Sequence, residues 1–176
     1  MTDNTRRMIS EWLHQVKYNH VGETKRKFYA DLCHAKAVIK VAAADSKVSE
    51  QTRQWVIGYS AAMGAPEEVL DLTEKYKPLV EDGTVPFHSK SGLDHARYGQ
   101  LWLFYDGFRA AIGGEELSPE KTTAIYAQAK KMIIDEEKIK QIEEIVDKEE
   151  KLRKRRLELL FPNGVGTAIR EVAAEK

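Results

Sequence analysis

The chain has 176 residues, of which 42% are hydrophobic and 32% charged, and its 28 Lys and Arg residues balance its 28 Asp and Glu residues. This length and composition fit one globular domain with a sizeable core, and the lack of a basic excess excludes a dedicated nucleic-acid binder. A single cysteine, Cys33, excludes an internal disulfide and a thiolate zinc cluster within the chain. No apolar run is long enough to span a bilayer, and the first residues lack the apolar core of a secretory signal, so we expect a cytoplasmic protein.

Helical periodicity dominates the chain, and no stretch alternates strictly enough to predict a strand. A first helix is predicted over about residues 4–19. Its apolar face is formed by Met8, Ile9, Trp12, Leu13 and Val16. A second helix is predicted over about residues 23–44, with an apolar stripe formed by Phe28, Leu32, Ala35, Ile39 and Ala42.

Capping residues mark the next two helices. Ser49 is in an N-cap position, and Gly64 ends the helix that Ser49 begins. Pro66 is expected in the first turn of the helix that follows. The turn residues between 80 and 92 then predict a loop that is long for a helical domain.

The helix predicted over about residues 93–112 is apolar on most of its sides, and we expect it at the buried centre. Ser118 is predicted to cap a further helix that runs to about residue 134. Asp135 is predicted to cap a long helix that Pro162 ends, and Thr167 to cap a short terminal helix over 167–174. The basic run from Lys151 to Arg156 lies on the long helix, and we interpret it as a solvated face.

The sequence also matches itself at an offset of 69 residues. Tyr29 then falls on Tyr98, Ser49 on Ser118, and Met63 on Met132, so caps and apolar faces coincide. We therefore predict a single helical domain over 1–176 with two pseudo-symmetric units, about 22–79 and about 93–160. Each unit alone would leave an apolar stripe exposed, so the two should pack together around the second and fifth helices.

The segment KAVIKVAAADSKVSE, residues 36–50, is followed by a helix that contains Trp55, Val56 and Ile57. This segment resembles the tellurite-resistance TerB-like helical domain family, with the likeness strongest over residues 30–75. The resemblance implies an all-α bundle of about seven to eight helices with internal pseudo-symmetry. It also implies a loose association with stress response and with metal or membrane sensing. Ser46 stands where the family pattern has glycine.

Two carboxylate–histidine pairs have a spacing that places both members on one helical face. They are Glu11 with His14 and Asp31 with His34, and carboxylate-bridged metal bundles use such pairs. Asp45 is a further candidate for a divalent metal ion, because oxygen ligands suit calcium or magnesium. The alternative is that these residues are ordinary surface or half-buried helix positions, with His34 hydrogen-bonded to a neighbour.

Asp106 lies within the most apolar helix, where a carboxylate must be paired, protonated or placed beside a pocket. We predict that Asp106 and His34 are the acid–base groups if the protein is an enzyme. The predicted ligand-binding residues are Trp102, Tyr105, His95 and His88, with Arg109, His34 and His95 as partners of Asp106. The alternative is that Asp106 faces a solvent channel and anchors a loop.

The sequence contains no phosphate-binding glycine loop, nucleophile elbow or other recognisable catalytic motif. The leading hypothesis is therefore a TerB-like binding or sensing module, stress- or metal-related, rather than an enzyme. The first alternative is a small enzyme or ligand carrier with an aromatic pocket that uses Asp106 and His34. The second is a carboxylate–histidine metal-binding protein. We expect a protein or small-molecule partner, no nucleic acid and no transmembrane segment, and a homodimer is left open.

Overall fold

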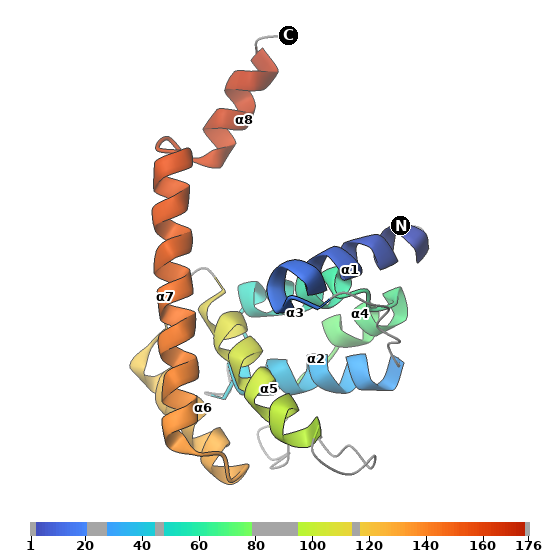
Figure 1. The fold of residues 1–176 in the computed structure, drawn as a ribbon, viewed down its shortest axis with the longest axis vertical. Helices are drawn as coiled ribbons and strands as arrows, with labels where there is room; N and C mark the ends of the chain where they lie inside the picture. Colours follow the sequence, from blue (N-terminus) through green and yellow to red (C-terminus); the bar gives the residue numbers. More distant parts are fainter. Residues whose placement is uncertain (1–2, 21–27, 45–47, 79–94, 114–116, 175–176) are drawn as a thin grey trace.

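The computed structural model describes residues 3–20, 28–44, 48–78, 95–113 and 117–174. These residues form eight α-helices and no strand, which confirms the predicted all-α class. The helices are α1 (Asp3–Tyr18), α2 (Phe28–Ala42), α3 (Glu50–Ala62), α4 (Glu67–Glu74), α5 (His95–Ile112), α6 (Pro119–Lys131), α7 (Glu136–Leu160) and α8 (Val165–Ala174) (Figure 1). The predicted loop over 80–92 lies outside the described residues.

The helix starts agree closely with the capping residues. Ser49, Ser118 and Asp135 are the N-caps of α3, α6 and α7, and each side chain accepts a hydrogen bond from a backbone N–H of the first turn. Two details differ from the prediction. Pro66 is the N-cap of α4 rather than a first-turn residue, and α8 begins at Val165, so Thr167 lies inside it.

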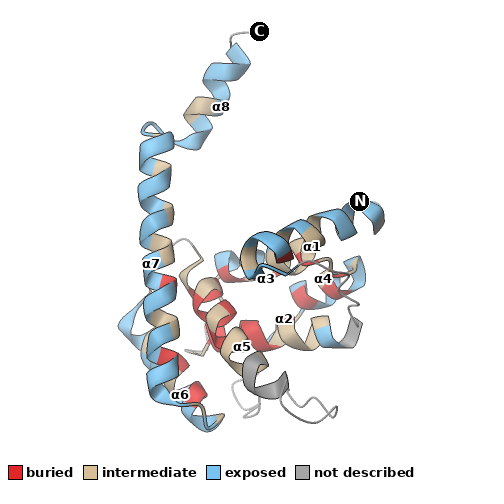
Figure 2. Ribbon diagram, viewed as in Figure 1, coloured by how far each residue is buried: buried red, intermediate tan, exposed pale blue. Residues whose placement is uncertain are grey.

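The core lies where α2 and α5 pack against each other. Both helices contribute fully buried side chains, among them Val38, Ile39 and Val41 from α2 and Leu103, Phe104 and Phe108 from α5. Gly107 allows this close approach, because a Cβ atom at that position would lie 2.3 Å from Val41 Cγ1. The prediction that the fifth helix is the buried centre is confirmed (Figure 2).

The helix starts also follow the 69-residue offset. α3 begins at Glu50 and α6 at Pro119, while α4 begins at Glu67 and α7 at Glu136. The turns after α3 and α6 each place a residue in the left-handed region at the same offset, namely Gly64 with φ +92° and Ile133 with φ +57°. The twofold repeat itself stays a prediction.

Helix α1 is rotated about its axis relative to the prediction, so that Ile9 and Leu13 of the predicted apolar face are only half-buried. Met8, Trp12 and Val16 point outward with 58%, 60% and 65% of their surface exposed. The buried positions are instead polar, Ser10 and His14. The apolar face predicted from periodicity is therefore largely a solvent-facing stripe.

The second half of α7 and all of α8 extend away from the body of the molecule (Figures 1 and 2). No residue of α8 is buried. Among the described helices, α7 is the longest, but it is rich in charge; none of these helices combines the length and apolar character required to cross a bilayer.

Candidate functional site

Asp106, on α5, is the centre of a buried polar cluster. Its side chain is fully buried, and His34 Nε2 on α2 donates a hydrogen bond to Asp106 Oδ2 at 3.1 Å. Lys17 Nζ on α1 lies 3.7 Å from the other carboxylate oxygen, Oδ1, which accepts no hydrogen bond within the described part of the chain. Because an unpaired buried carboxylate is strongly unfavourable, these two partners explain how Asp106 is tolerated in the core.

Aromatic rings enclose the Lys17 ammonium. Its Nζ lies 4.2 Å from the ring centre of Tyr59, 5.1 Å from that of Tyr105 and 5.4 Å from that of Tyr18. Such cation–π contacts partly replace the water that a buried ammonium loses.

The remaining walls come from Trp102 and from a tyrosine pair. The ring of Trp102 lies 5.2 Å from that of Tyr18 and 5.6 Å from that of His34. The hydroxyls of Tyr18 and Tyr59 are hydrogen-bonded at 2.6 Å. We call these seven residues the Asp106 cluster: Lys17, Tyr18, His34, Tyr59, Trp102, Tyr105 and Asp106.

Burial shifts the pKa of three groups in the cluster, and for Tyr105 it raises the pKa above the usual tyrosine value. Desolvation lowers the pKa of Lys17, and the opposing attraction of Asp106 only partly compensates. Burial also raises the pKa of Tyr59 well above its usual value, and the negative charge of Asp106 adds to the effect. The cluster therefore contains an amine that gives up its proton more readily than usual, beside a carboxylate and an imidazole.

A polar stripe on α1 explains how Lys17 reaches Asp106. Ser10, His14 and Lys17 are spaced i, i+4 and i+7, so they share one face of the helix. Ser10 Oγ donates to the carbonyl oxygen of Met63 at 2.8 Å, and His14 Nδ1 donates to the carbonyl oxygen of Ser10 at 2.7 Å. The two buried residues described on α1 are thus polar, while Ile9 and Leu13 are half-buried.

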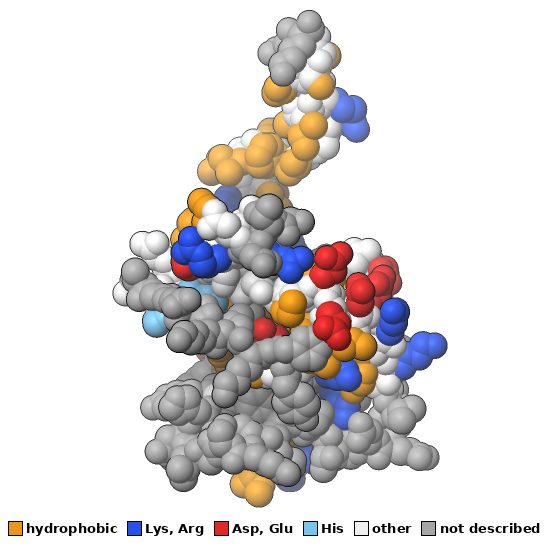
Figure 3. Space-filling view, turned by 90° about the vertical axis from the view of Figure 1, so that its right-hand side faces the viewer, with side chains coloured by type: hydrophobic (Ala, Val, Ile, Leu, Met, Phe, Trp, Pro, Cys, Tyr) orange, Lys and Arg blue, Asp and Glu red, His pale blue; other side chains and the backbone are white. Residues whose placement is uncertain are grey.

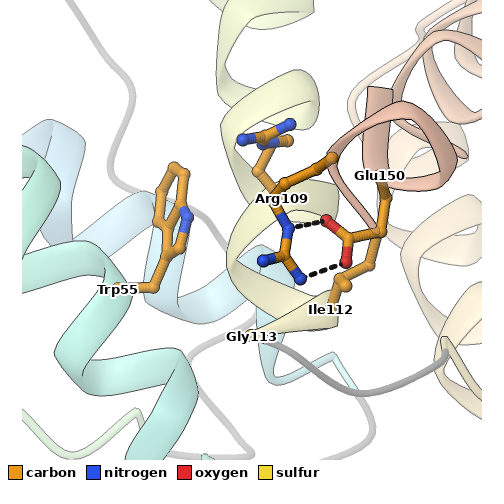
Figure 4. A pocket seen from close by; sticks show the side chains of 6 residues that line it. Trp55, Arg109, Ile112, Gly113 and Glu150 are labelled. Atoms are coloured by element: carbon orange, nitrogen blue, oxygen red, sulfur yellow. Dashed lines mark hydrogen bonds and ion pairs between the residues drawn. The ribbon is translucent and has the colours of Figure 1, made fainter. Parts of the chain in front are cut away.

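A second network and a pocket lie beside the cluster, between α3, α5 and α7. Glu149 accepts hydrogen bonds from Tyr105 Oη at 2.7 Å and from Arg109 Nη1 at 2.9 Å. The pocket has a volume of about 280 Å³ and is lined by Trp55, Arg109, Ile112, Gly113, Glu150 and Arg153. Figure 4 shows Trp55 and Glu150 on opposite sides of α5. Its two arginines are already paired, Arg109 with Glu149 and Arg153 with Glu150.

The structure brings together four of the residues predicted for the site: His34, Trp102, Tyr105 and Asp106. Among the partners expected for Asp106, His34 is present, but Arg109 binds Glu149 instead. His88 and the side chain of His95 lie outside the described residues.

Sequence reasoning missed Lys17, Tyr18 and Tyr59. The available signal was the helical spacing of Ser10, His14 and Lys17, which places them on one face of α1. Such a polar face is compatible with burial as well as with exposure to solvent. That stripe decides which side of α1 faces the bundle.

The carboxylate–histidine pairs are engaged in other contacts. Glu11 accepts a hydrogen bond from Arg7 at 2.8 Å, and His14 binds the Ser10 carbonyl. His34 Nε2 is directed at Asp106, and Asp45 lies outside the described residues. Within the described part of the chain, no group of three or more His, Cys, Asp and Glu side chains is placed to hold a metal ion.

Comparison with known proteins places this arrangement in a known fold. The structure is similar to the crystal structure of a tellurite resistance protein from Nostoc punctiforme, with a TM-score of 0.74 and 22% sequence identity. The match covers 93% of this chain and 98% of the other. It confirms, at the level of the fold, the TerB-like resemblance found in the sequence. No family model matches the sequence, and no curated protein matches it.

Proposed function

We propose that this chain, which shares the fold of a tellurite resistance protein, is a binding module whose contact surface is the outward face of α1. The observation that carries the proposal is the orientation of α1, which presents Met8, Trp12 and Val16 to solvent at i, i+4 and i+8. Three large apolar side chains on one exposed helix face are typical of an interaction site.

The Asp106 cluster supports this proposal by fixing the orientation of α1. Lys17 and Tyr18, at the end of the helix, contact Asp106 and Tyr59, and Ser10 is bonded to the Met63 carbonyl. Because these directional contacts are polar, they select the face of α1 that turns inward. The rotation of α1 about its axis is then fixed, and the same apolar residues always face solvent, where a partner can bind them.

The structural neighbour supports a connection with tellurite stress. Its description as a tellurite resistance protein applies to that protein, and the 22% identity supports only a shared fold. We extend the association to this chain as part of the proposal, and resistance to tellurite is the phenotype that tests it.

A ligand carrier or enzyme is the second candidate, and the geometry of His34 and Asp106 favours it. The two side chains, 72 positions apart in the sequence, meet at 3.1 Å, which is within reach for proton transfer. The lowered pKa of Lys17 would add a nucleophilic amine. Against this reading, the carboxylate is fully buried and already carries two protein partners.

The test measures the growth of a tellurite-sensitive bacterium that expresses the protein, across a series of potassium tellurite concentrations. We expect the wild type to raise the inhibitory concentration, and the surface variant Met8→Ser/Trp12→Ser/Val16→Ser to abolish this gain while folding normally by circular dichroism. Ile145→Ser, which removes a half-exposed apolar side chain from α7, is the matched control. Full protection by the surface variant would refute the proposed binding surface.

Asp106→Asn separates the two candidates. Asparagine preserves the shape of the side chain but removes the charge and the basic oxygen. If a folded Asp106→Asn protein protects as well as the wild type, acid–base chemistry at Asp106 plays no part in the function. If that protein is folded but inactive while the surface variant is active, the enzyme or carrier reading replaces ours.

A further inference from the structure

The C-terminal arm, residues 151–174, carries a large exposed apolar surface. Its exposed aliphatic residues are Leu152, Leu159, Leu160, Val165, Ile169 and Val172, with exposed fractions between 42% and 80%. Figure 3 shows hydrophobic side chains gathered over α8, clear of the rest of the molecule. Burial of exposed aliphatic side chains is favourable, and an exposed apolar surface of this kind is typical of an interaction site.

The body of the molecule has an exposed surface, formed by α1 and α4, that also combines apolar and charged side chains. Its apolar part is the stripe Met8, Trp12 and Val16 on α1. Helix α4 lies beside α1, since Arg6 and Glu67 form an ion pair at 3.6 Å. Helix α4 exposes four acidic side chains, Glu67, Glu68, Asp71 and Glu74. Acidic side chains are seen gathered on this side of the body in Figure 3.

The arm has the opposite charge. Lys154, Arg155 and Arg156 are exposed, and none of them makes an ion pair with another described residue. Most of the exposed apolar residues of the arm follow these cations in the chain, and the acids of α4 lie on a helix that is ion-paired to α1 through Arg6. The two surfaces are therefore complementary both in their apolar parts and in charge.

The lengths of the helices also agree. At 1.5 Å per residue, the 10 residues of α8 span about 15 Å and the 16 residues of α1 about 24 Å, so α8 fits along α1. Val165 and Ile169 are spaced i, i+4, as are Met8 and Trp12, which is the spacing of ridges that interdigitate between packed helices.

We propose that the occupant of the α1–α4 surface is the C-terminal arm of a second copy of this chain, and that two copies exchange arms about a twofold axis. The inference rests on the proposed function for the role of the outward face of α1. The 25-residue helix α7 carries α8 away from its own body, which favours an exchange between copies (Figure 1). A twofold arrangement uses both surfaces of each copy, which helps to reach the roughly 800 Å² per partner of a stable interface.

The first test is the mass in solution by light scattering during gel filtration. We expect about twice the 20.1 kDa chain mass for the wild type, and the single-chain mass for Ile169→Ser/Val172→Ser. Ile145→Ser, on the part of α7 outside the arm, should leave the dimer intact. A wild-type protein with the single-chain mass at all concentrations up to about 100 μM, where even a weak micromolar dimer would be populated, overturns the proposal.

The charge pairing is tested by exchange of signs. Arg155→Glu/Arg156→Glu should weaken the dimer at least tenfold, and so should Glu68→Lys/Asp71→Lys. Combining the four substitutions should restore most of the affinity, because opposite charges face each other again. Failure of the combined variant to recover, with each pair still folded, contradicts the contact between the arm and α4.

The contact itself is tested with single cysteines in a Cys33→Ser background. Chains with Trp12→Cys mixed with chains with Ile169→Cys should form a mixed disulfide on mild oxidation, whereas Ala127→Cys on α6 should not react. A disulfide within single chains that carry both cysteines, at the single-chain mass, would show that the arm folds back on its own body. Binding of a monomeric protein to vesicles containing 30% phosphatidylserine would assign the arm to a membrane surface. Either result overturns the exchange.

The two proposals fail separately. A monomeric protein whose Met8, Trp12 and Val16 variant still loses tellurite protection refutes the exchange and leaves the binding module. An arm-exchanged dimer whose surface variant still protects fully refutes the proposed function and leaves the exchange.

Discussion

Replacement of Gly107 by alanine tests the close approach of α2 and α5 on which the buried site depends. The added Cβ atom would lie 2.3 Å from Val41 Cγ1 and 2.9 Å from Val41 Cβ. Carbon atoms in contact are normally about 3.5–4.0 Å apart, so the closest contact is more than about 1 Å too short. Val41 is fully buried and β-branched, and it therefore has little freedom to move away.

The expected magnitude is the difference between two effects. Overpacking of a core costs about 1–3 kcal/mol, and a clash of this size with a rigid neighbour belongs near the upper end. Alanine in a helix gains about 1 kcal/mol over glycine. The net expectation is a loss of about 2 kcal/mol, which lowers Tm by about 4–8 °C for a chain of this size.

Gly58→Ala is the matched control, because Gly58 also lies inside a helix but a Cβ there meets no atom within 4 Å. It should gain about 1 kcal/mol and raise Tm by about 2–4 °C. Thermal unfolding by circular dichroism measures both variants. Combining Gly107→Ala with Val41→Ala should cost less than the sum of the single changes. If Gly107→Ala raises Tm as Gly58→Ala does, the two helices are not in the contact described.

Three further predictions concern the turn after α6, the titration of the site and its metal content. Ile133→Gly should raise the free energy of unfolding in urea by roughly 0.5–1 kcal/mol. The left-handed conformation costs a residue with a Cβ atom about 1–2 kcal/mol, whereas glycine costs about 0.4–1 kcal/mol through the greater freedom of the unfolded chain. Ile133→Ala, which keeps the Cβ atom, should show no such gain. Because the pKa of Tyr59 is raised in the folded protein, only the unfolded chain loses this proton just above pH 10. The free energy of unfolding should therefore fall as pH rises beyond about 10, and it should fall less steeply for Tyr59→Phe. Urea titrations between pH 9 and about 11.5 measure both proteins. The lowered pKa of Lys17 acts in the opposite sense, since below pH 10.5 the unfolded chain binds this proton more tightly and stability rises with pH towards that value. Elemental analysis of untagged protein purified without chelator should find no stoichiometric metal, because Glu11, His14 and His34 are bonded to protein groups; stoichiometric iron, manganese, zinc or calcium would contradict this assignment.

The helix starts were predictable because their signals are local. Ser49, Ser118 and Asp135 each cap the helix that follows through a hydrogen bond to a nearby backbone N–H, which depends only on a few adjacent residues. The central position of α5 was also predictable, since a helix that is apolar on most sides must be covered on most sides.

The orientation of α1 and the full Asp106 cluster were not predictable in this way. Periodicity showed the apolar residues of α1, but not that Lys17 would reach a carboxylate 89 positions away in the sequence. Pairing of a buried charge depends on tertiary contacts. Here the contact between Lys17 and Asp106 turns the polar side of α1 towards the bundle. The sequence does indicate that Asp106 needs a partner, and His34 is one of the partners predicted for it.

The polar attachment of α1 has a consequence for how the fold opens. The contact of α2 with α5 contains many fully buried apolar side chains, whereas α1 has no fully buried apolar residue among those described and is bonded through Ser10, Lys17 and Tyr18. We therefore expect α1 to open as a separate cooperative unit, whose amide hydrogens exchange with solvent through a smaller opening than global unfolding. Its release would bring water to Asp106 while the core stays closed, so hydration of that carboxylate reports the docking state of a single helix.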